Sequence, residues 1–386
     1  MKIAFVYDAV YPYRIGGVEK RIFEVARRLA RRGHEVHIFG LMEWEGDTSF
    51  IKEGVYHHGL GKSRRFYIRG RRSISEALYF GWKVLTPLLK EHFDIIDCQN
   101  FPYFSCFSAA FGAKIRRSIL VITWHEVWGD YWYVYLGRFG LPGKVIELLT
   151  SRLSDNLVAV SDLTKKDLIS IRKSADITLI PNGIDFERIN TIQPAELTSD
   201  IIFTGRLLKE KNVGLLIRAL VLVREEIPEI SCVIIGDGPE MDSLQGLVKE
   251  LKLEDNIKFW GFVQNHDELI AAMKSSHIFA TPSTREGFGI SALEAMACGL
   301  PVVTVDAPKN ALKDLVTEKT GRVSSLTPEA FAVAVLGCLH RRDAMTGHCK
   351  ELAEDYNWEM VVEKTEKFYL GIIEVESSRG KNSHNL

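Results

Sequence analysis

The chain is poor in cysteine and lacks any long hydrophobic run. Its six cysteines form no C-x-x-C pair and no cluster with histidine, which argues against a zinc site or a disulfide framework. We interpret them as buried free thiols in a reducing compartment. No apolar stretch reaches the ~20 residues that span a bilayer, and the run at Met1–Asp8 is too short for a secretory signal. We therefore expect a cytoplasmic protein, with peripheral contact at the inner face of a membrane left open.

Several catalytic signatures are also missing. The chain has no Walker A sequence, no G-x-S-x-G and no zinc-ligand spacing. No D-x-D is flanked by strand signals, so a diphosphate held by a metal ion is not expected. The dinucleotide fingerprint G-x-G-x-x-G is absent near the N terminus, which argues against a dehydrogenase. Any phosphate group must then be bound by the protein's own cations and backbone.

Length and charge suggest two domains of different character. With 386 residues the chain is long for one domain and suits two of about 150–200 residues each. The formal net charge is −1, but residues 1–190 hold 28 Lys and Arg against 21 Asp and Glu, a net charge of +7, and the rest carries −8. A basic half is typical of a protein with an anionic partner, and chance variation of the surface is the alternative. We expect no nucleic-acid partner.

Short apolar runs alternate with helical patterns along the chain, which predicts parallel α/β structure. In the first half, a strand at Lys2–Tyr7 leads through a loop with Gly16-Gly17 into a helix, and Glu35–Phe39 is the next strand. This βαβ pattern recurs, and a second series of strands begins at Ile201. The predicted fold class is α/β, with two Rossmann-like domains whose parallel sheets face a central cleft.

A stretch without periodic pattern separates the two series and sets the expected boundaries. In open parallel sheets, ligands bind at the carboxyl ends of the strands, so the informative residues should follow strands directly. The expected parts are an N-terminal Rossmann-like domain at 1–185, a linker at 186–198, a C-terminal Rossmann-like domain at 199–357, a C-terminal helix at 358–376 that packs back on the first domain, and a frayed tail at 377–386.

Two glutamates eight positions apart flank a turn that leads into a helix. The segment Glu286–Ile290 holds two glycines, and Glu294 follows within the predicted helix. Glycines let a backbone approach a ligand, and a helix N terminus offers unpaired N–H groups to an anion. Two carboxylates near a phosphate make sense only if they contact hydroxyl groups, such as those of a sugar and a ribose. An isolated pair of this kind is more often one loop glutamate and one helix-surface glutamate.

Basic residues and a histidine accompany this pair. Gly205-Arg206 ends the first strand of the second domain and Lys211 precedes the next helix, so both cations can reach one diphosphate. A solvated basic turn is the alternative. His125 follows the strand at Ile119–Thr123, where it can donate a hydrogen bond or act as an acid or base. The alternative is a hydrogen-bonded structural histidine.

Together these segments resemble the large retaining glycosyltransferase family four, of the group 1 type, which has the GT-B fold. The likeness covers nearly the whole chain, in the expected order. The matching segments are Gly16–Glu19, Ala159–Asp162, Ile180–Asp185, Thr204–Leu207, Glu210–Asn212, Ile235–Pro239, Pro282–Ser283, Glu286–Gly289, Glu294–Gly299 and Pro301–Val303.

The resemblance implies a role for each matching residue. Arg206 and Lys211 resemble the pair that holds the donor diphosphate, and Glu294 resembles the carboxylate that binds the nucleotide ribose. Glu286 resembles the glutamate near the donor-sugar hydroxyls, and His125 the histidine that meets the donor sugar. The implied catalytic residues are His125, Arg206, Lys211 and Glu286. The implied donor-binding residues are Gly16, Gly17, Gly205, Arg206, Lys211, Gly236, Glu286, Gly287, Phe288, Gly289, Ile290 and Glu294.

One segment departs from the family pattern. Members often carry Gly-Gly and then a glutamate shortly after the strand that corresponds to Pro301–Val305, and here Asn310 or Asp314 stands in that region. The departure leaves the identity of the donor sugar open without affecting the fold.

The resemblance implies transfer of a sugar, with retention and without a metal ion, from a nucleotide sugar to a hydroxyl group. It also implies that the domain at 1–185 takes the acceptor and that the domain at 199–357 binds the nucleotide sugar. The donor is a UDP- or GDP-sugar, which is a co-substrate, and no cofactor is expected. The acceptor is a soluble or lipid-linked glycan. A nucleotide-sugar epimerase of the same architecture and a non-catalytic sugar-nucleotide-binding protein are the alternatives.

A basic cluster in the first half is the candidate for acceptor or membrane contact. Basic residues attract anionic lipid headgroups, and the aromatic rings dense in residues 124–135 favour the membrane interface. The alternative is a solvated basic loop beside an aromatic segment that packs next to His125. The candidate arginines are Arg64, Arg65, Arg69, Arg71 and Arg72.

Overall fold

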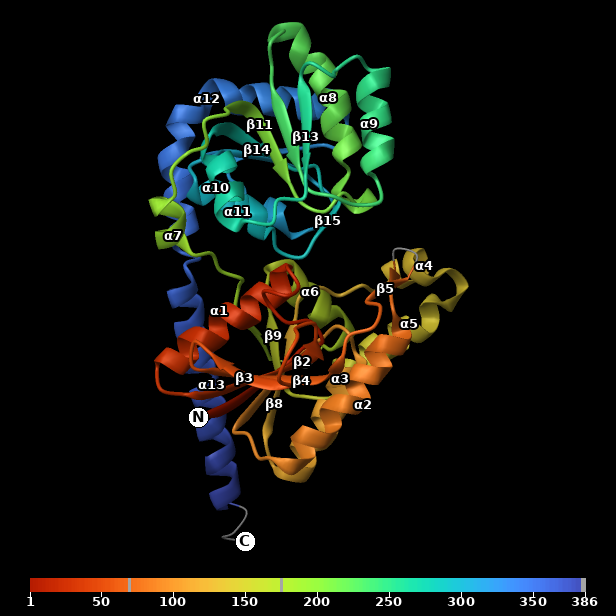
Figure 1. Cartoon of the computed structure of the whole chain (residues 1–386), viewed down its shortest axis with the longest axis vertical. Helices are drawn as coiled ribbons and strands as arrows, with labels where there is room; N and C mark the ends of the chain where they lie inside the picture. Colours follow the sequence, from red (N-terminus) through yellow and green to blue (C-terminus); the bar gives the residue numbers. More distant parts are fainter. Residues whose placement is uncertain (69–70, 174–175, 383–386) are drawn as a thin grey trace. The chain divides into compact units, whose positions relative to one another are not determined.

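The computed structural model describes residues 1–68, 71–173 and 176–382 of the chain (Figure 1). It divides into two compact units, of which the second is one continuous segment, Gly183–Asn357. The first unit combines Met1–Asn182 with Trp358–Leu386. The chain therefore leaves the first unit after Asn182 and returns to it at Trp358.

The first unit is built on an eight-stranded sheet of order β10-β9-β8-β7-β1-β2-β4-β3. Neighbouring strands are parallel except β3 and β4. The strands are β1 (Lys2–Val6), β2 (Glu35–Met42), β3 (Ser49–Lys52), β4 (Val55–Lys62), β7 (Ile95–Gln99), β8 (Ile119–Trp124), β9 (Asn156–Ala159) and β10 (Ile177–Leu179). Outside this sheet, β5 (Tyr67–Ile68) and β6 (Arg71–Arg72) pair antiparallel.

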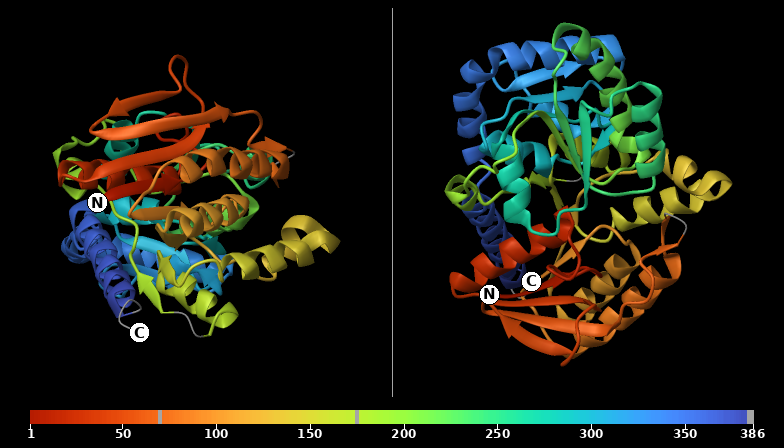
Figure 2. Two further views of the ribbon diagram at one scale, coloured as in Figure 1. Left: turned by 90° about the horizontal axis from the view of Figure 1, so that it is seen from below. Right: turned by 45° about the horizontal axis from the view of Figure 1, so that its top comes forward.

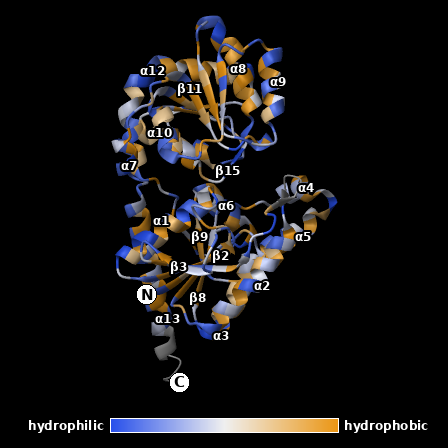
Figure 3. Ribbon diagram, in the orientation of Figure 1, coloured by the Kyte–Doolittle hydropathy of each residue, from blue (hydrophilic) through white to orange (hydrophobic). Residues whose placement is uncertain are grey.

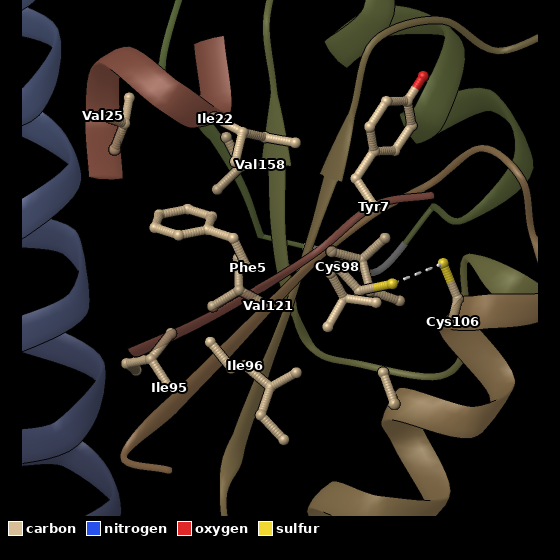
Figure 4. Close-up of a cluster of buried hydrophobic side chains, with 14 of the residues drawn as sticks. Phe5, Tyr7, Ile22, Val25, Ile95, Ile96, Cys98, Cys106, Val121 and Val158 are labelled. Carbon is tan, nitrogen blue, oxygen red and sulfur yellow. Dashed lines mark hydrogen bonds between the residues drawn. The ribbon is translucent and has the colours of Figure 1, made fainter. Parts of the chain in front are cut away.

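Helices cover both faces of this sheet (Figures 1 and 2). Alternation along β7 shows which helix lies on which face, because successive side chains of a strand point to opposite sides. Cys98 lies with its Sγ 3.6 Å from Sγ of Cys106 on α3 (Figure 4), whereas Asp97 accepts a hydrogen bond from Tyr369 on α13. The helices are α1 (Gly17–Arg31), α2 (Ile74–Lys90), α3 (Phe104–Arg116), α4 (Tyr131–Leu136), α5 (Gly140–Thr150), α6 (Asp162–Ile171) and α13 (Trp358–Asn382).

The central strands of both sheets are strongly hydrophobic (Figure 3). Because a parallel sheet is covered on both faces, its strands form continuous apolar runs rather than alternating ones. Phe5, Ile96 and Val121 are buried on the central strands of the first sheet, among the side chains drawn in Figure 4. These runs explain why short apolar stretches in the sequence predict the strands.

The second unit contains a six-stranded parallel sheet of order β13-β12-β11-β14-β16-β18. Numbered along the chain, this is the Rossmann order 3-2-1-4-5-6. The strands are β11 (Ser199–Thr204), β12 (Cys232–Ile235), β13 (Ile257–Gly261), β14 (Ser276–Ala280), β16 (Val302–Val305) and β18 (Gly321–Ser324). The short strands β15 (Arg285–Glu286) and β17 (Lys309–Asn310) pair with each other. The helices are α7 (Phe186–Thr191), the 3₁₀ turn η2 (Lys209–Lys211), α8 (Val213–Glu226), α9 (Met241–Glu250), α10 (His266–Lys274), α11 (Ile290–Ala297) and α12 (Pro328–Glu354).

Both sheets reverse their strand order at one point. In the second unit the reversal lies between β11 and β14, and in the first unit it lies between β1 and β7. Ligands of doubly wound sheets bind in the crevice at this switch point, outside the carboxyl ends of the strands. The prediction of two Rossmann-like domains with parallel sheets is confirmed.

The ends of the predicted parts differ from the observed elements. Residues 186–191, expected as linker, form α7, which packs against α11. The C-terminal helix does not stop at residue 376 but continues to Asn382, although residues 377–386 were expected to fray. Trp358 and Tyr369 of this helix are fully buried in the core of the first unit. Burying such side chains stabilises the returning segment by about 1.5–3 kcal/mol each.

Glycines allow the ends of β11 and β12 to touch. Gly236 has a φ of 139°, and a Cβ there would lie 1.9 Å from the carbonyl oxygen of Gly205. Its N–H donates to the carbonyl of Gly261 at 2.8 Å, and the N–H of Gly205 donates to the carbonyl of Ile235 at 3.0 Å. Only glycine combines this close approach with this backbone conformation.

We expect Gly236→Ala to destabilise the protein by about 2–4 kcal/mol, because a Cβ adds both a clash and backbone strain. Gly246→Ala is the matched control, since Gly246 lies inside α9 and a Cβ there meets nothing within 4 Å. Alanine in a helix interior is more stable than glycine by roughly 0.5–1 kcal/mol. Urea denaturation of both variants measures the contrast, and equal stabilities would contradict the close-approach argument.

Candidate active site

The loops that follow β11 and β14 are tied together at the switch point of the second unit. Lys211 forms an ion pair with Glu286, 75 positions further along the chain. One residue earlier, the carbonyl of Glu210 accepts hydrogen bonds from the N–H of Thr284 at 2.8 Å and from its hydroxyl at 3.1 Å. The structure therefore brings Lys211 and Glu286 together, as their predicted positions after neighbouring strands require.

The turn from Glu286 into α11 is shaped to receive an anion. Gly289 begins the helix with a φ of 98°, and a Cβ there would lie 3.0 Å from the side chain of Leu312. Phe288 is buried beneath the turn and packs against Tyr356 with ring centroids 5.8 Å apart. Since glycine has no capping side chain, the N–H groups of the first turn, beginning at Ile290, remain for a ligand.

The other predicted donor-binding residues of this unit border the same strand ends. Arg206 is exposed and follows Gly205 directly at the end of β11. Gly236 lies against Gly205 at the end of β12, and Gly287 is partly exposed between Glu286 and Phe288. The arrangement offers two cations, a helix N terminus and carboxylates within one group of loops. A diphosphate linked to hydroxyl-bearing sugars matches those groups.

Glu294 has a partner that sequence reasoning missed. This carboxylate is buried on α11, and its Oε1 lies 2.9 Å from Nε2 of His266, the first residue of α10. The two residues are 28 positions apart, and nothing in the pattern around His266 marks it as part of a site. Only the packing of α10 against α11 reveals the contact.

Asn310 lies in the segment that departs from the family pattern, and its side chain forms hydrogen bonds within the protein. Its side chain is fully buried, and its amide donates to the hydroxyl of Thr304 at 3.0 Å and to the carbonyl of Val305 at 2.9 Å. Its side-chain oxygen accepts the N–H of Leu312 at 3.2 Å. Asn310 therefore shapes the loop, while Asp314 is exposed.

His125 lies at the carboxyl end of β8 in the first unit, where it was predicted. Its Nε2 is 2.8 Å from Oε1 of Gln99, and its backbone N–H donates to Oδ1 of Asn100 at 3.1 Å. Burial, with a smaller effect of the Arg21 charge, lowers the pKa of His125 to about 3. The imidazole is therefore neutral at physiological pH. This favours the hydrogen-bonding role over the acid/base role.

A second charged cluster follows β1 and includes Arg72. Asp8 is fully buried and forms an ion pair with Arg72, while its Oδ1 is buried without a hydrogen-bond partner. Burial outweighs the Arg72 charge and raises the pKa of Asp8 to about 6. The Arg72 guanidinium also lies 4.3 Å from the ring centroid of Phe66, and the backbone N–H of Arg72 donates to the hydroxyl of Tyr135 at 2.5 Å. Contrary to expectation, Arg72 is held inside the unit and is not a solvated cation for a membrane.

Gly16 and Gly17 open α1 beside this cluster. A Cβ on Gly16 would lie 2.4 Å from the carboxylate of Glu19, and Gly17 is the exposed first residue of the helix. Burial, partly offset by a hydrogen bond from the backbone and assisted by the nearby Asp8 charge, raises the pKa of Glu19 to about 7. The loop predicted to close on phosphate therefore borders two carboxyl groups that retain protons more strongly than usual.

The other arginines predicted to contact the acceptor or a membrane are either exposed or not fully described by the structure. Arg64 and Arg65 have exposed side chains, and their backbone N–H groups donate to the buried carboxylate of Glu76 at 3.2 and 2.6 Å. Arg69 lies outside the described residues, and for Arg71 only the backbone is described. Glu76 thus fixes the backbone that presents Arg64 and Arg65 to solvent.

The aromatic stretch at 124–135 is largely packed inward. Trp124 and Trp132 are buried, and Trp128 lies between Phe101 and Trp132 with ring centroids 5.2 and 4.7 Å apart. These three rings are packed within the first unit, as the alternative interpretation of a packed aromatic segment expects.

Two further properties concern the described part of the chain. There, no helix combines the length and the apolar character needed to cross a bilayer. Within the same residues, no three His, Cys, Asp or Glu side chains gather where they could hold a metal ion.

The fold and the charged loops at the switch points define a glycosyltransferase of the GT-B class. The glycosyltransferase family 4 model matches residues 15–188, and the glycosyl transferases group 1 model matches residues 186–355. The chain belongs to this family of glycosyltransferases, as the sequence motifs predict.

Relatives and a solved structure extend the likeness over nearly the full length. The chain is 25% identical over 382 residues to the gpi3 subunit of a phosphatidylinositol N-acetylglucosaminyltransferase of Schizosaccharomyces pombe, covering 94% of this chain and 79% of that one. It is 26% identical to an alpha-monoglucosyldiacylglycerol synthase of Streptococcus pneumoniae, covering 97% and 86%. The structure of Anabaena HepE with UDP and glucose superposes with a TM-score of 0.71 at 20% identity, covering 95% and 98%.

The raised pKa of Glu19 predicts how stability depends on pH. Between pH 4.5 and about 7 the unfolded chain is ionised at Glu19 while the folded chain keeps the proton, so the wild type loses stability as the pH rises through this window. Glutamine has no proton to release. We therefore expect Glu19→Gln to gain on the order of 1–3 kcal/mol in unfolding free energy, relative to the wild type, between pH 5 and pH 8.

Urea denaturation at a series of pH values measures this difference. Glu45→Gln is the control for the loss of one carboxylate, because Glu45 is exposed. If the difference in unfolding free energy between Glu19→Gln and the wild type does not change with pH, Glu19 ionises normally in the folded protein and the prediction is wrong.

Proposed function

We propose that the protein is a retaining, metal-independent glycosyltransferase that moves a sugar from a nucleoside diphosphate to a hydroxyl group of an acceptor. The observation that carries the proposal is the Lys211–Glu286 ion pair at the glycine turn that opens α11. An ammonium group has three N–H donors, so Lys211 can keep Glu286 and still donate to a diphosphate. Arg206 adds a planar pair of donors at the end of β11.

In the proposed mechanism, these groups stabilise the leaving diphosphate. The bond between the anomeric carbon and the diphosphate oxygen breaks, and the acceptor oxygen bonds to the same face of that carbon. The acceptor proton passes to the departing phosphate oxygen. Positive side chains and helix N–H groups act where negative charge grows, which is the usual way in which such sites lower a barrier.

We assign one carboxylate to each end of the donor, the ribose and the transferred sugar. Glu294 accepts hydrogen bonds from the ribose hydroxyls, with His266 holding one of its oxygens. Glu286 accepts from hydroxyls of the donor sugar. HepE was crystallised with UDP and glucose, and the fission-yeast relative is named for transfer of N-acetylglucosamine. We therefore propose a UDP-sugar as donor in preference to a GDP-sugar.

Replacement of either cation tests the diphosphate site. We expect Arg206→Ala or Lys211→Ala to lower the transfer rate about 100- to 1000-fold without unfolding the protein, since each removes a charge from the leaving group. Lys209→Ala is the matched control, because Lys209 is an exposed lysine in the same turn, η2. Wild-type activity should also survive excess EDTA.

Initial rates with radiolabelled nucleotide sugars measure these effects. Full activity in both variants would refute the assignment of the two cations. Loss of wild-type activity in EDTA, restored by Mg²⁺ or Mn²⁺, would refute metal independence.

For the acceptor we propose a lipid-linked molecule at an anionic membrane surface. Both curated relatives above are named for glycolipid synthesis. In this chain the α4–α5 surface, which we define as Val134, Phe139 and Leu141, leaves its three apolar side chains 72%, 60% and 58% exposed. The exposed Arg138 accompanies them, with its guanidinium 5.1 Å from the ring centroid of Phe139.

The energetics of this surface suit a membrane interface. Transfer of three such side chains out of water is worth roughly 1.5–3 kcal/mol each when complete, and each nearby cation adds about 1 kcal/mol at an anionic surface. The hydrogen bond between the N–H of Arg72 and Tyr135 connects α4 to the basic segment that carries Arg64 and Arg65. Apolar and basic groups can therefore bind one lipid surface together.

Sedimentation with lipid vesicles tests this acceptor proposal. We expect binding to vesicles rich in anionic lipid at low salt, weaker binding at physiological salt, and a further loss in Arg64→Ser/Arg65→Ser. Replacement of the α4–α5 surface by serine should abolish binding at both salt concentrations.

Phe262→Ser/Val333→Ser is the matched control, because these apolar side chains are 61% and 71% exposed in the second unit. If the wild type does not bind anionic vesicles at low salt, the membrane part of this proposal is wrong and a soluble acceptor replaces it.

A further inference from the structure

Four polar side chains lie on one face of the first sheet, at the switch point. Asp97 and Gln99 are two positions apart on β7, and Thr123 and His125 are two positions apart at the end of β8. Gln99 and Thr123 are register partners on these neighbouring strands. Because side chains alternate along a strand, the four project to the same side of the sheet. Helices α1 and α13 pack on each other, and α13 packs on this side.

The hydrogen bonds among these side chains have a fixed direction. Asp97 accepts from three donors: Nε2 of Gln99 at 2.9 Å, the hydroxyl of Thr123 at 2.8 Å and the hydroxyl of Tyr369 at 2.6 Å. A carboxylate only accepts, so the amide nitrogen of Gln99 must point at Asp97. The amide oxygen of Gln99 then faces His125.

This orientation determines the tautomer of His125. Because the Gln99 oxygen only accepts, Nε2 of His125, 2.8 Å away, must carry the hydrogen. In a neutral imidazole the other nitrogen, Nδ1, is then an acceptor. Burial of the ring, and to a smaller extent the charge of the buried Arg21 on α1, lower the pKa of His125 to about 3, so the neutral form persists. The titratable groups near the Gln99–His125 pair are Arg21 on α1, Asp97 on β7 and Tyr369 on α13. Glu126 follows His125 directly in the chain.

We propose that Asp97 and Gln99 are positioning residues that hold His125 with Nδ1 as a hydrogen-bond acceptor, so that the site accepts a sugar hydroxyl and rejects a carboxylate. This inference rests on the proposed function, in which the donor is a nucleotide sugar, and on the contact of His125 with the donor sugar that the family resemblance implies. A protonated histidine would attract an anionic sugar, whereas an acceptor lone pair repels one. Tyr369 connects the returning C-terminal helix to this arrangement through Asp97.

Nitrogen NMR of histidine reads the tautomer directly and needs no substrate. Two-bond ¹H–¹⁵N spectra of the ¹⁵N-histidine-labelled protein separate the two neutral tautomers and the charged ring, and the signal missing from His125→Gln identifies the residue. We expect the wild-type ring to carry its proton on Nε2 and to show no titration between pH 5 and pH 9. In Gln99→Leu we expect a mixture of tautomers. A proton on Nδ1 in the wild type, or titration within this range, would overturn the inference while leaving the proposed function standing.

Kinetics of Gln99→Glu supply the second test. A carboxylate beside Nε2 stabilises the imidazolium and raises the pKa of His125 toward its ordinary value of 6.5. Protonation converts Nδ1 from an acceptor into a donor, so kcat/KM for the donor should fall by up to about fourfold from pH 8 to pH 6, relative to the wild-type profile. Gln99→Leu should lower kcat/KM about tenfold at both pH values, equivalent to about 1.4 kcal/mol.

Tyr369→Phe and Thr123→Val are the matched controls. Each removes one donor to Asp97 and leaves the Gln99–His125 hydrogen bond in place, so the tautomer and the pH profile should not change even where the melting temperature falls. If Gln99→Glu keeps the wild-type pH profile, and Gln99→Leu keeps the wild-type tautomer and rate, then Gln99 has a structural role only and the inference is wrong. If no nucleotide sugar is turned over by the wild type, the NMR result still decides the inference, and it is the proposed function that fails.

Discussion

The reversal of strand order between β11 and β14 is the constraint on which the candidate donor site depends. The connections from the two strands run to opposite faces of the sheet, so their loops diverge and leave a crevice at the strand ends. Lys211 comes from one loop and Glu286 from the other, and their ion pair spans the divergence. Gly205 and Gly236 let the adjacent strand ends approach without a side chain between them. The position of the glycine turn that opens α11 therefore follows from the topology.

The first unit uses the same topology but fills its switch point with buried polar groups. Asp8, Glu19 and Asp97 lie in the interior, and burial raises the pKa of each. Such groups are costly unless hydrogen bonds or charges compensate, and here Arg72, Thr123, Gln99 and Tyr369 do so for two of them. The returning helix α13 thus contributes to the polar interior as well as to the core, which explains why the last segment belongs to the first unit.

Some features of the fold and the candidate site could be predicted from the sequence, and others could not. The strands could be predicted because both faces of a parallel sheet are buried, and the positions of Arg206, Lys211 and His125 followed from their places after strands. The helix at 186–191 was missed because its six residues show no sustained period. The burial of Arg72 was missed as well, since a run of basic residues in sequence does not reveal that Asp8, 64 positions away, pairs with one of them.

The sequence by itself determined the fold class, the family and the residue types at the strand ends, because hydrophobic periodicity and short glycine-containing motifs are local properties of the chain. The tertiary structure alone decided which of these residues meet. His266 contacts Glu294 because their helices pack together, and the side chain of Asn310 forms hydrogen bonds within its own loop. Which nitrogen of His125 carries the proton depends on Gln99 and Asp97 of a neighbouring strand. Contacts of this kind join residues that are distant in sequence. The direction of each hydrogen bond depends on donors and acceptors that only the folded chain brings within bonding distance.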